Sequence, residues 1–129
     1  MLNTKVMAKH NLLGEEGERL AASYLQQKGY SILETNWRYS RAEVDIIAMD
    51  GDVLVCVEVK SRSTEMWGSP ETAVTAKKEK LLGDALSMYM EEIDHQWEVR
   101  FDVVAVVIIN DRHHEIKHYK DAFFPGMNS

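Results

Sequence analysis

The sequence has few of the residues that mark secreted, membrane-bound or disulfide-stabilised proteins. It contains one cysteine, Cys56, which excludes an internal disulfide and suits a reducing compartment. No apolar run approaches the roughly 18 residues that a membrane-spanning helix needs. The N-terminal segment also lacks the apolar core and the small-residue cleavage site of a signal peptide. We therefore expect a cytoplasmic protein that does not associate with a membrane.

An excess of positive charge is also missing. The 129 residues include 15 Lys and Arg against 21 Asp and Glu, for a net charge of −6. This balance argues against a general nucleic-acid coat protein, since such proteins are usually basic. It does not exclude a nuclease, whose metal-binding carboxylates add negative charge. Because no repeat or linker interrupts the chain, we expect a single domain over 1–129, with flexible ends at 1–12 and 125–129.

Hydrophobic patterning predicts an α/β (α+β) fold with one mixed sheet. Helical spacing begins near Gly14 and stops at Gly29, and the small residues Gly14, Gly17 and Ala21 would let this helix approach a sheet closely. The pattern then predicts a strand at 30–39, a hairpin at 43–60, a loop at 62–73, a helix at 75–93, a strand at 99–110, and a final strand with a turn at 113–123. The expected order is αβββαββ.

The segment at 43–60, EVDIIAMDGDVLVCVEVK, predicts an aliphatic hairpin that nevertheless carries charged residues. The Asp-Gly pair at 50–51 is a strong signal for a two-residue turn. This turn would place Asp45 opposite Cys56 and Glu43 opposite Glu58, and residues directly opposed across a hairpin share a face. One face would then be aliphatic throughout: Val44, Ile46, Ala48, Val53, Val55, Val57 and Val59.

The other face of this hairpin would carry the charges at its end away from the turn. There Asp45 and Glu58 would be diagonal neighbours, about 7–8 Å apart at the backbone. Carboxylates this close repel each other unless a cation or a proton lies between them. The alternative is a solvated sheet face with a surface pair between Glu58 and Lys60. The valine-rich flanks favour a strand covered on both faces, where charges are usually paired or bind a metal.

The chain resembles a known family through several motifs. Asp45, followed thirteen residues later by Glu58-Val59-Lys60, resembles the signature of PD-(D/E)XK nucleases, in which an acidic residue precedes an E-x-K strand across a hairpin. Over about residues 14–124, the chain resembles the YraN-like family of small uncharacterised bacterial proteins through GEEGERLAASYLQQKGYSIL, NWR, EVDIIAMDG, VCVEVKSR, WGSP, AVTAKK, RFDVVAV and KDAF. The resemblance implies a restriction-endonuclease-like core, close to archaeal Holliday-junction resolvases, and a metal-dependent nuclease acting on DNA, with branched or structured DNA as a candidate substrate.

Residue by residue, the resemblance carries over a set of catalytic positions. Lys78 matches a lysine early in the second helix of the family. Ala42 departs from the family, which usually has glycine there, and since alanine disfavours a positive φ, the second strand could begin differently. The positions that match the family's catalytic residues are Asp45, Glu58 and Lys60, together with Glu18 of the first helix.

Hydrolysis of a phosphodiester needs a nucleophilic water and stabilisation of developing negative charge. Asp45 and Glu58, with the Val59 carbonyl, could supply the oxygen ligands that Mg²⁺ or Mn²⁺ prefers. Lys60 would orient the water or stabilise an oxygen of the phosphate. Glu18 could complete the site, or its negative charge could simply interact with the positive end of the helix dipole.

Basic and aromatic residues lie around the same segments. Lys78 could form a phosphate clamp at the helix N-terminus, or the lysines there could be ordinary surface residues. Trp37 and Trp67 could stack on bases, although packing in the core or anchoring of a loop is favoured. The residues that could hold a nucleic-acid backbone are Arg38, Arg41, Arg62, Lys77 and Lys78.

Other functions stay open at this point. The spacing of His113, His114 and His118 fits no standard zinc pattern, so a polar strand end is the better interpretation. A non-catalytic nucleic-acid-binding module on a nuclease scaffold is one alternative to an enzyme. A protein-interaction module is another, for which the AFFPG segment near the C-terminus is a small apolar candidate. A homodimer is also open, because nucleases that cut two strands are often dimers.

Overall fold

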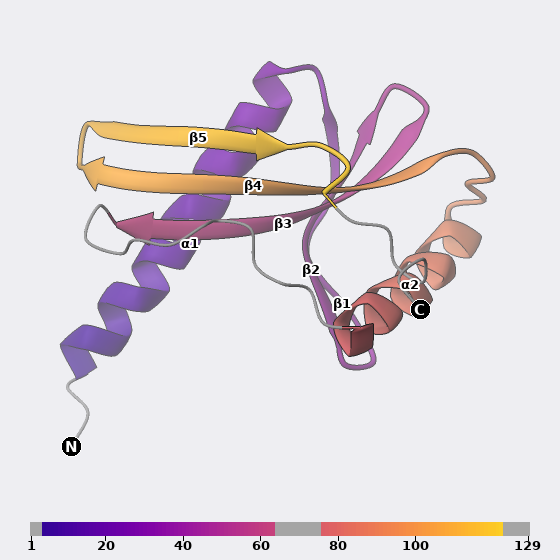
Figure 1. The fold of residues 1–129 in the computed structure, drawn as a ribbon, viewed down its shortest axis with the longest axis horizontal. Helices are drawn as coiled ribbons and strands as arrows, with labels where there is room; N and C mark the ends of the chain where they lie inside the picture. Colours follow the sequence, from indigo (N-terminus) through magenta and orange to yellow (C-terminus); the bar gives the residue numbers. More distant parts are fainter. Residues whose placement is uncertain (1–3, 64–75, 123–129) are drawn as a thin grey trace.

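Five strands form one sheet in a computed structural model that describes residues 4–63 and 76–122 (Figure 1). The elements are α1 (Thr4–Gln27), β1 (Ser31–Tyr39), β2 (Ala42–Asp50), β3 (Val53–Ser63), α2 (Ala76–Glu92), β4 (Val99–Asn110) and β5 (His113–Tyr119). The strand order is β1-β2-β3-β4-β5, with β3 and β4 parallel and the other neighbours antiparallel. The mixed sheet and the order αβββαββ confirm the expected fold class.

The first helix is longer than the sequence pattern predicts. It begins at Thr4, so the start predicted near Gly14 is wrong. The chain has no glycine or proline from Thr4 to the residue before Gly14, and its lysines, methionine and alanine are good helix formers. The helix stops where expected, because Gly29 has a φ of 94° and the Tyr30 N–H donates to the Leu25 carbonyl at 3.0 Å.

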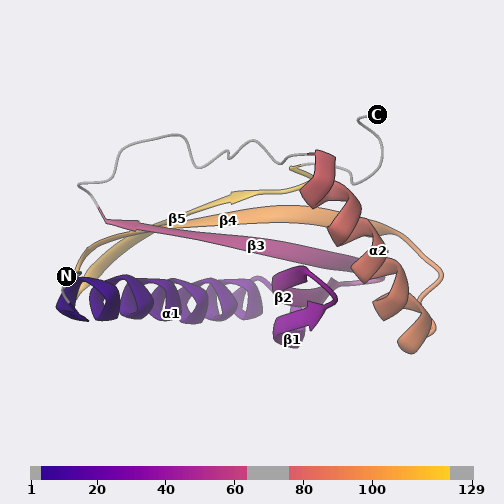
Figure 2. The same cartoon turned by 90° about the horizontal axis from the view of Figure 1, so that it is seen from below.

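The two helices cover opposite faces of the sheet (Figure 2). Tyr89 of α2 packs against the face that carries Phe101, whereas Leu25 of α1 packs against the other face. Val44 belongs to the α2 cluster, so the aliphatic face expected on the hairpin is wrong at this residue. The α1 cluster contains Ala21, Leu25, Tyr30, Ile46, Ala48, Val55, Val57, Val104 and Val106. The α2 cluster contains Val44, Ile47, Leu54, Cys56, Leu82, Leu86, Tyr89 and Phe101.

A glycine lets α1 approach β3 closely. A Cβ atom added at Gly17 would lie 1.6 Å from the Ser61 hydroxyl oxygen and 2.6 Å from the Ser61 Cβ. Gly14, by contrast, has nothing within 4 Å of an added Cβ. The close approach predicted from the small residues of this helix is therefore confirmed at Gly17 and does not involve Gly14.

The turn between β2 and β3 lies one position beyond the expected one. Asp50 pairs with Val53, so the two turn residues are Gly51 and Asp52 rather than Asp50 and Gly51. Gly51 has a φ of 61°, which fits a type II′ turn, where glycine takes the first central position. The Asp-Gly pattern instead favours a type I′ turn with glycine second, and this is why the expected register differs.

The hairpin register changes with the turn. Each residue of β2 pairs two positions further along β3 than expected, and an even change of register keeps every side chain on its face. The expected pairs, Asp45 with Cys56 and Glu43 with Glu58, are therefore wrong. Regular pairing with β3 ends at Ile46, and one further step in this register would bring Asp45 directly across from Glu58. The two carboxylates are thus placed closer in register than the diagonal arrangement predicts.

Candidate functional site

Asp45 lies where β2 separates from β3. Its Oδ2 atom accepts a hydrogen bond of 2.8 Å from the Val59 N–H, so a side chain takes the place of a backbone carbonyl in the strand ladder. Burial raises the pKa of Asp45 to about 6, and repulsion from Glu18, Glu58 and Glu43 acts in the same direction, although the Val59 N–H stabilises the ionised form. At neutral pH Asp45 therefore carries a negative charge that a nearby cation would stabilise.

Glu58 is bracketed by two lysines. Its Oε1 atom lies 2.5 Å from Lys78 Nζ and 3.1 Å from Lys60 Nζ. Burial acts to raise the pKa of Glu58, but the contacts with Lys78 and Lys60 outweigh it and hold this pKa below its ordinary value. Its Oε2 atom is buried and has no hydrogen-bond partner among the described residues. One oxygen of Glu58 is thus paired, and the other is left for a further ligand.

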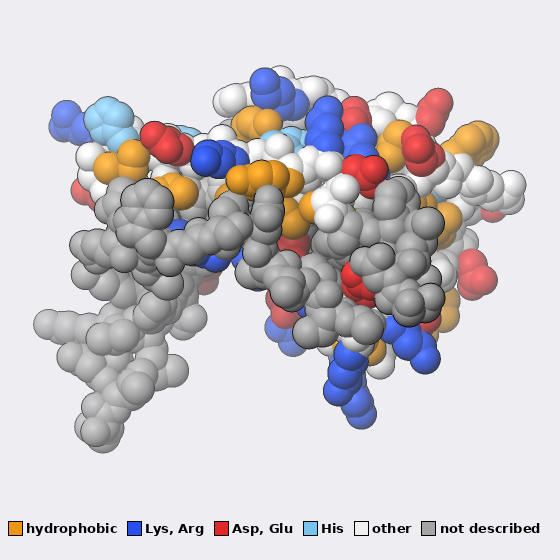
Figure 3. All heavy atoms as spheres, in the orientation of Figure 1, with side chains coloured by type: hydrophobic (Ala, Val, Ile, Leu, Met, Phe, Trp, Pro, Cys, Tyr) orange, Lys and Arg blue, Asp and Glu red, His pale blue; other side chains and the backbone are white. Residues whose placement is uncertain are grey.

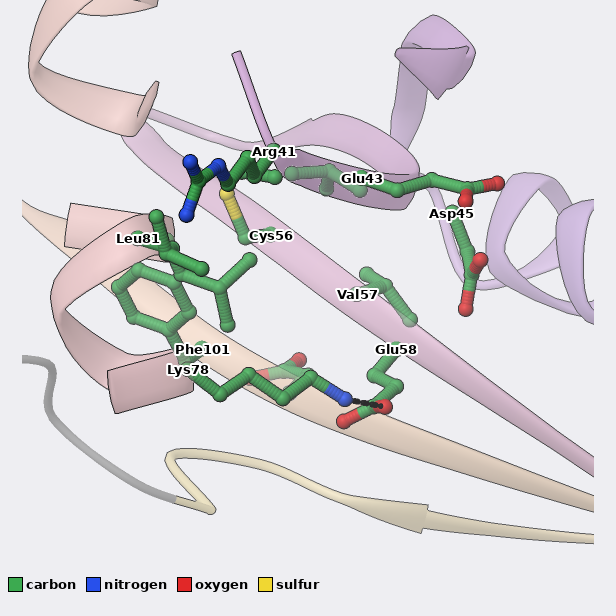
Figure 4. A pocket seen from close by; sticks show the side chains of 13 residues that line it. Arg41, Glu43, Asp45, Cys56, Val57, Glu58, Lys78, Leu81 and Phe101 are labelled. Atoms are coloured by element: carbon green, nitrogen blue, oxygen red, sulfur yellow. Dashed lines mark hydrogen bonds and ion pairs between the residues drawn. The ribbon is translucent and has the colours of Figure 1, made fainter. Parts of the chain in front are cut away.

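A pocket of about 350 Å³ runs from these carboxylates to α2 (Figure 4). Arg41, from the turn between β1 and β2, and Lys78, from the first turn of α2, lie on opposite sides of Phe101 in this view. The Glu58 carboxylate points toward Lys78, whereas Asp45 lies on the other side of Val57. The pocket therefore combines acidic, basic and apolar walls.

The basic residues expected to contact nucleic acid do not all come to this pocket. Arg41 and Lys78 line it. Arg38 instead pairs with Glu43 across the β1–β2 hairpin at 3.5 Å, and both side chains are exposed. Glu43 therefore belongs to an exposed ion pair, and it also lines the pocket. Lys77 is exposed on α2, and Arg62 lies near the end of β3, two residues beyond Lys60.

Charge on the visible surface is mixed in sign. In Figure 3, Lys and Arg side chains alternate with Asp and Glu and do not gather into one basic stripe on the part of this face that is described. This distribution agrees with the net charge of −6. Binding of a polyanion through broad electrostatic attraction is therefore disfavoured on this face, and contact through a few local cations is favoured.

Trp37 mainly packs against other aromatic rings. It meets Tyr89 of α2 edge to face, with ring centroids 5.2 Å apart, and stacks on Tyr39 at 6.2 Å with an angle of 8° between the planes. The packing role favoured for Trp37 is confirmed. Trp67, residues 64–73 of the expected loop and most of the AFFPG segment lie outside the described residues.

A buried ionic cluster on the α1 face of the sheet escapes the sequence reasoning. Asp102 of β4 is fully buried and accepts hydrogen bonds from Arg100 Nε at 2.8 Å and Arg100 Nη2 at 3.0 Å. His118 Nε2 lies 2.7 Å from Asp102 Oδ2. Burial acts to raise the pKa of Asp102, but His118, Arg100 and the Asp121 N–H outweigh it and lower this pKa to about 2. All three histidines lie on β5, where His113 and His114 are exposed, whereas the side chain of His118 is 6% exposed and belongs to this cluster.

A sequence signal for this cluster does exist. Asp102 interrupts the aliphatic run of β4 at a position that alternation assigns to the same face as Val104 and Val106. Arg100, two residues earlier, falls on that face as well. A buried carboxylate in such a strand needs a charged partner, and the i, i+2 spacing identifies Arg100. The partner from β5 depends on long-range pairing, which local patterns do not encode.

The fit of the site to a divalent metal depends on Asp45 and Glu58. Among the described residues, no three or more Asp, Glu, His or Cys side chains converge into a ready-made metal cluster. The buried Oε2 atom of Glu58 has no hydrogen-bond partner among the described residues, and Asp45 contributes a second carboxylate to the same pocket. Hard carboxylate oxygens are the ligands that Mg²⁺ and Mn²⁺ prefer. These two carboxylates are therefore the residues of the pocket whose chemistry would fit such an ion.

None of the helices within 4–63 and 76–122 is both long enough and apolar enough to cross a bilayer.

Comparisons of the sequence with a family model and with known proteins point to the same family. A family model described as "Uncharacterised protein family UPF0102" matches residues 17–106. A UPF0102 protein of Christiangramia forsetii is 49% identical over 118 residues, which cover 92% of this chain and 98% of the relative. A UPF0102 protein of Flavobacterium psychrophilum is 48% identical over 118 residues, with the same shares of the two chains. A UPF0102 protein of Rhodococcus opacus is 45% identical over 116 residues, covering 88% of this chain and 98% of the relative.

Proposed function

We propose that this chain, which belongs to the uncharacterised protein family UPF0102, is a metal-dependent nuclease that hydrolyses phosphodiester bonds of DNA in the cytoplasm. The observation that carries the proposal is the buried Oε2 atom of Glu58, which has no partner among the described residues beside a carboxylate, Asp45, whose pKa is raised. Both carboxylates line the same pocket. Branched or structured DNA is the substrate to test first.

Three groups of the chain would hold Mg²⁺ or Mn²⁺. Asp45 and Glu58 would contribute carboxylate oxygens, and the Val59 carbonyl would contribute a third ligand. The hydrogen bond from the Val59 N–H holds Asp45 Oδ2 at 2.8 Å, which leaves Asp45 Oδ1 to face a cation. When bound, such an ion lowers the pKa of its water and neutralises charge on the phosphate.

The lysines would act on the phosphate itself. Lys60 Nζ lies 3.1 Å from Glu58, and its N–H groups can orient the attacking water or stabilise an oxygen on which charge develops. Lys78 and Arg41, on either side of the pocket, would hold the flanking phosphates. Glu18 is close enough to raise the pKa of Asp45, and we assign it to completing the site through water.

A cleavage assay tests this proposal. Labelled linear, nicked and four-way DNA is incubated with the protein in Mg²⁺, in Mn²⁺ and in EDTA. We expect cleavage of at least one substrate in metal and none in EDTA, with a loss of about 100-fold or more in Asp45→Asn and Glu58→Gln. Asp52→Asn, which changes an exposed aspartate in the turn at the other end of the β2–β3 hairpin, is the matched control and should cleave normally. Absence of metal-dependent cleavage on every substrate, or full activity in Asp45→Asn, would refute the proposal.

A second function is favoured by one contact. Lys78 pairs with Glu58 at 2.5 Å, which occupies an oxygen that a metal ligand would otherwise offer. A protein that binds nucleic acid without cutting it would keep this ion pair permanently. Salt-dependent DNA binding with no cleavage in either metal would support this function over the first. Light scattering would show in the same samples whether the protein is a homodimer.

A further inference from the structure

The interior of the pocket beside Asp45 and Glu58 has an apolar lining that phosphodiester hydrolysis does not require. Val44, Leu82 and Phe101 contribute to its walls. Its volume of about 350 Å³ is within the range of about 300–1,000 Å³ that is usual for small-ligand sites. A DNA duplex would present only sugar and phosphate here, because its bases stay stacked inside the helix. The apolar lining therefore fits a flat apolar group that has left a duplex or was never part of one.

A stacked aromatic pair adjoins this pocket. Trp37 and Tyr39 lie on the same face of β1, with their rings 6.2 Å apart and 8° from parallel. The sheet register pairs Trp37 with Val44 and Tyr39 with Ala42, and both of these β2 residues line the pocket. Directly paired residues share a face of a sheet. Tyr39, which is 36% exposed, therefore presents the outer ring of the pair beside the pocket.

Cations lie on two sides of the same pocket. Arg41 comes from the turn beside Tyr39, and Lys78 comes from the first turn of α2 (Figure 4). Leu81 and Phe101 lie between them in this view. Proteins that bind single strands combine aromatic rings, on which bases stack, with cations that follow the backbone. Both components are present here within reach of Asp45 and Glu58.

We infer that this pocket receives the base of an unpaired nucleotide, and that the substrate is nucleic acid with a single-stranded segment. In this arrangement the base enters between Val44 and Phe101, the next base stacks on Tyr39, and Arg41 and Lys78 hold the phosphates. The inference deepens the proposed function, since it names the substrate class of the same site. The binding step itself uses no metal and can be measured without cleavage.

Fluorescence anisotropy in EDTA tests the inference. The probes are a labelled thymidine 15-mer, a uridine 15-mer and a 15-base-pair duplex, with thymidine monophosphate as an unlabelled competitor. We expect either single strand to bind at least about tenfold more tightly than the duplex. Tyr39→Ala should raise the dissociation constant for the single strand by about 5- to 150-fold, which is the effect of losing one base stack. Arg41→Ala should also weaken binding of the single strand and reduce the dependence of this binding on salt concentration.

Matched controls separate the pocket from general surface effects. Trp97→Ala removes an aromatic ring that is 68% exposed beyond the far end of α2, and Arg112→Ala removes an exposed arginine in the turn after β4. Neither substitution should change binding of the single strand. Because Tyr39 is on the surface, circular dichroism should show that the Tyr39→Ala variant is folded. Leu81→Trp, which fills the pocket from α2, should weaken binding of the single strand as Tyr39→Ala does.

Three outcomes would overturn the inference. The first is equal affinity for the duplex and the single strand, and the second is unchanged single-strand binding in both Tyr39→Ala and Leu81→Trp. The third is displacement of the 15-mer by thymidine monophosphate at equal nucleotide concentration, which would make the pocket a mononucleotide site. The results that would refute this inference differ from those that would refute the proposed function. Cleavage of duplex DNA without a preference for single strands contradicts only this inference, whereas single-strand binding without cleavage contradicts only the nuclease.

Discussion

The ionised carboxylate of Asp45 destabilises the metal-free fold, and this effect can be measured without a substrate. Its pKa rises from an ordinary value of 3.8 to about 6. At about 1.4 kcal/mol for each pKa unit, the difference corresponds to about 3 kcal/mol. Well below pH 3.8 the residue is protonated in the folded and unfolded chains alike, and the penalty is absent. The penalty grows as pH rises from about 4 to 6, because the unfolded chain has lost this proton while the folded chain still holds it, and it is complete above pH 6.

Asp45→Asn should remove this penalty. The asparagine keeps an oxygen that can accept the Val59 N–H but carries no charge. At pH 7.5 in EDTA we expect the variant to be more stable than the wild type by up to about 3 kcal/mol, which raises the Tm by up to about 10 °C for a chain of this size. At pH 4 the two proteins should be nearly equal. Thermal unfolding followed by circular dichroism at both pH values measures the difference.

Metal should reverse the order of stability. Mg²⁺ binding to the native state would stabilise the wild type by about 4.1 kcal/mol at a concentration of 1,000 times its dissociation constant, which exceeds the penalty of about 3 kcal/mol. Asp45→Asn should gain much less from the same addition. Asp52→Asn, in the exposed turn, is the control and should behave like the wild type throughout. If Asp45→Asn is no more stable than the wild type at pH 7.5 in EDTA, the charge of Asp45 does not destabilise the metal-free fold.

Two further predictions concern the packing around the site. Gly17→Ala places a methyl group 1.6 Å from the Ser61 hydroxyl oxygen, and it should lower the free energy of unfolding, measured in urea, by about 1–3 kcal/mol. Gly14→Ala has open space around it and should be neutral or stabilising. Equal effects of the two substitutions would contradict the close approach of α1 to β3. Asp102→Asn leaves its arginine partner buried with less compensation and should cost about 3–5 kcal/mol, while the exposed Asp111→Asn should cost little. Because the pKa of Asp102 is lowered to about 2, the stability it contributes is present above pH 4 and is lost as pH falls toward 2, so an Asp102→Asn variant should show a smaller loss over this interval in acid titrations.

Local patterns in the sequence predicted most of the fold. The Schellman stop at Gly29, the aliphatic strands and the apolar stripe of α2 all depend on residues within one or two turns of each other. The close approach at Gly17 also followed from the small residues of α1. These features were predictable because their physical causes lie in neighbouring residues.

Features set by backbone geometry or by distant contacts were harder to predict. The turn at Gly51 could take its glycine first or second, and only the paired strands decide between the two. Val44 packs in the α2 cluster, although strict alternation from Ile46 assigns it to the other face. The partner of Asp102 on β5 and the pairing of Lys78 with Glu58 join residues far apart in sequence. Convergence of Asp45 and Glu58 in register survived the change of turn only because the register moved by an even number of residues.

The most direct test of the central claim is a crystal structure of the protein with Mn²⁺, using the anomalous signal of the metal. Our account predicts a peak in contact with carboxylate oxygens of both Asp45 and Glu58, and no peak there in an Asp45→Asn crystal prepared in the same way. The absence of a peak in the wild type, with Glu58 still paired only to Lys60 and Lys78, would contradict the account.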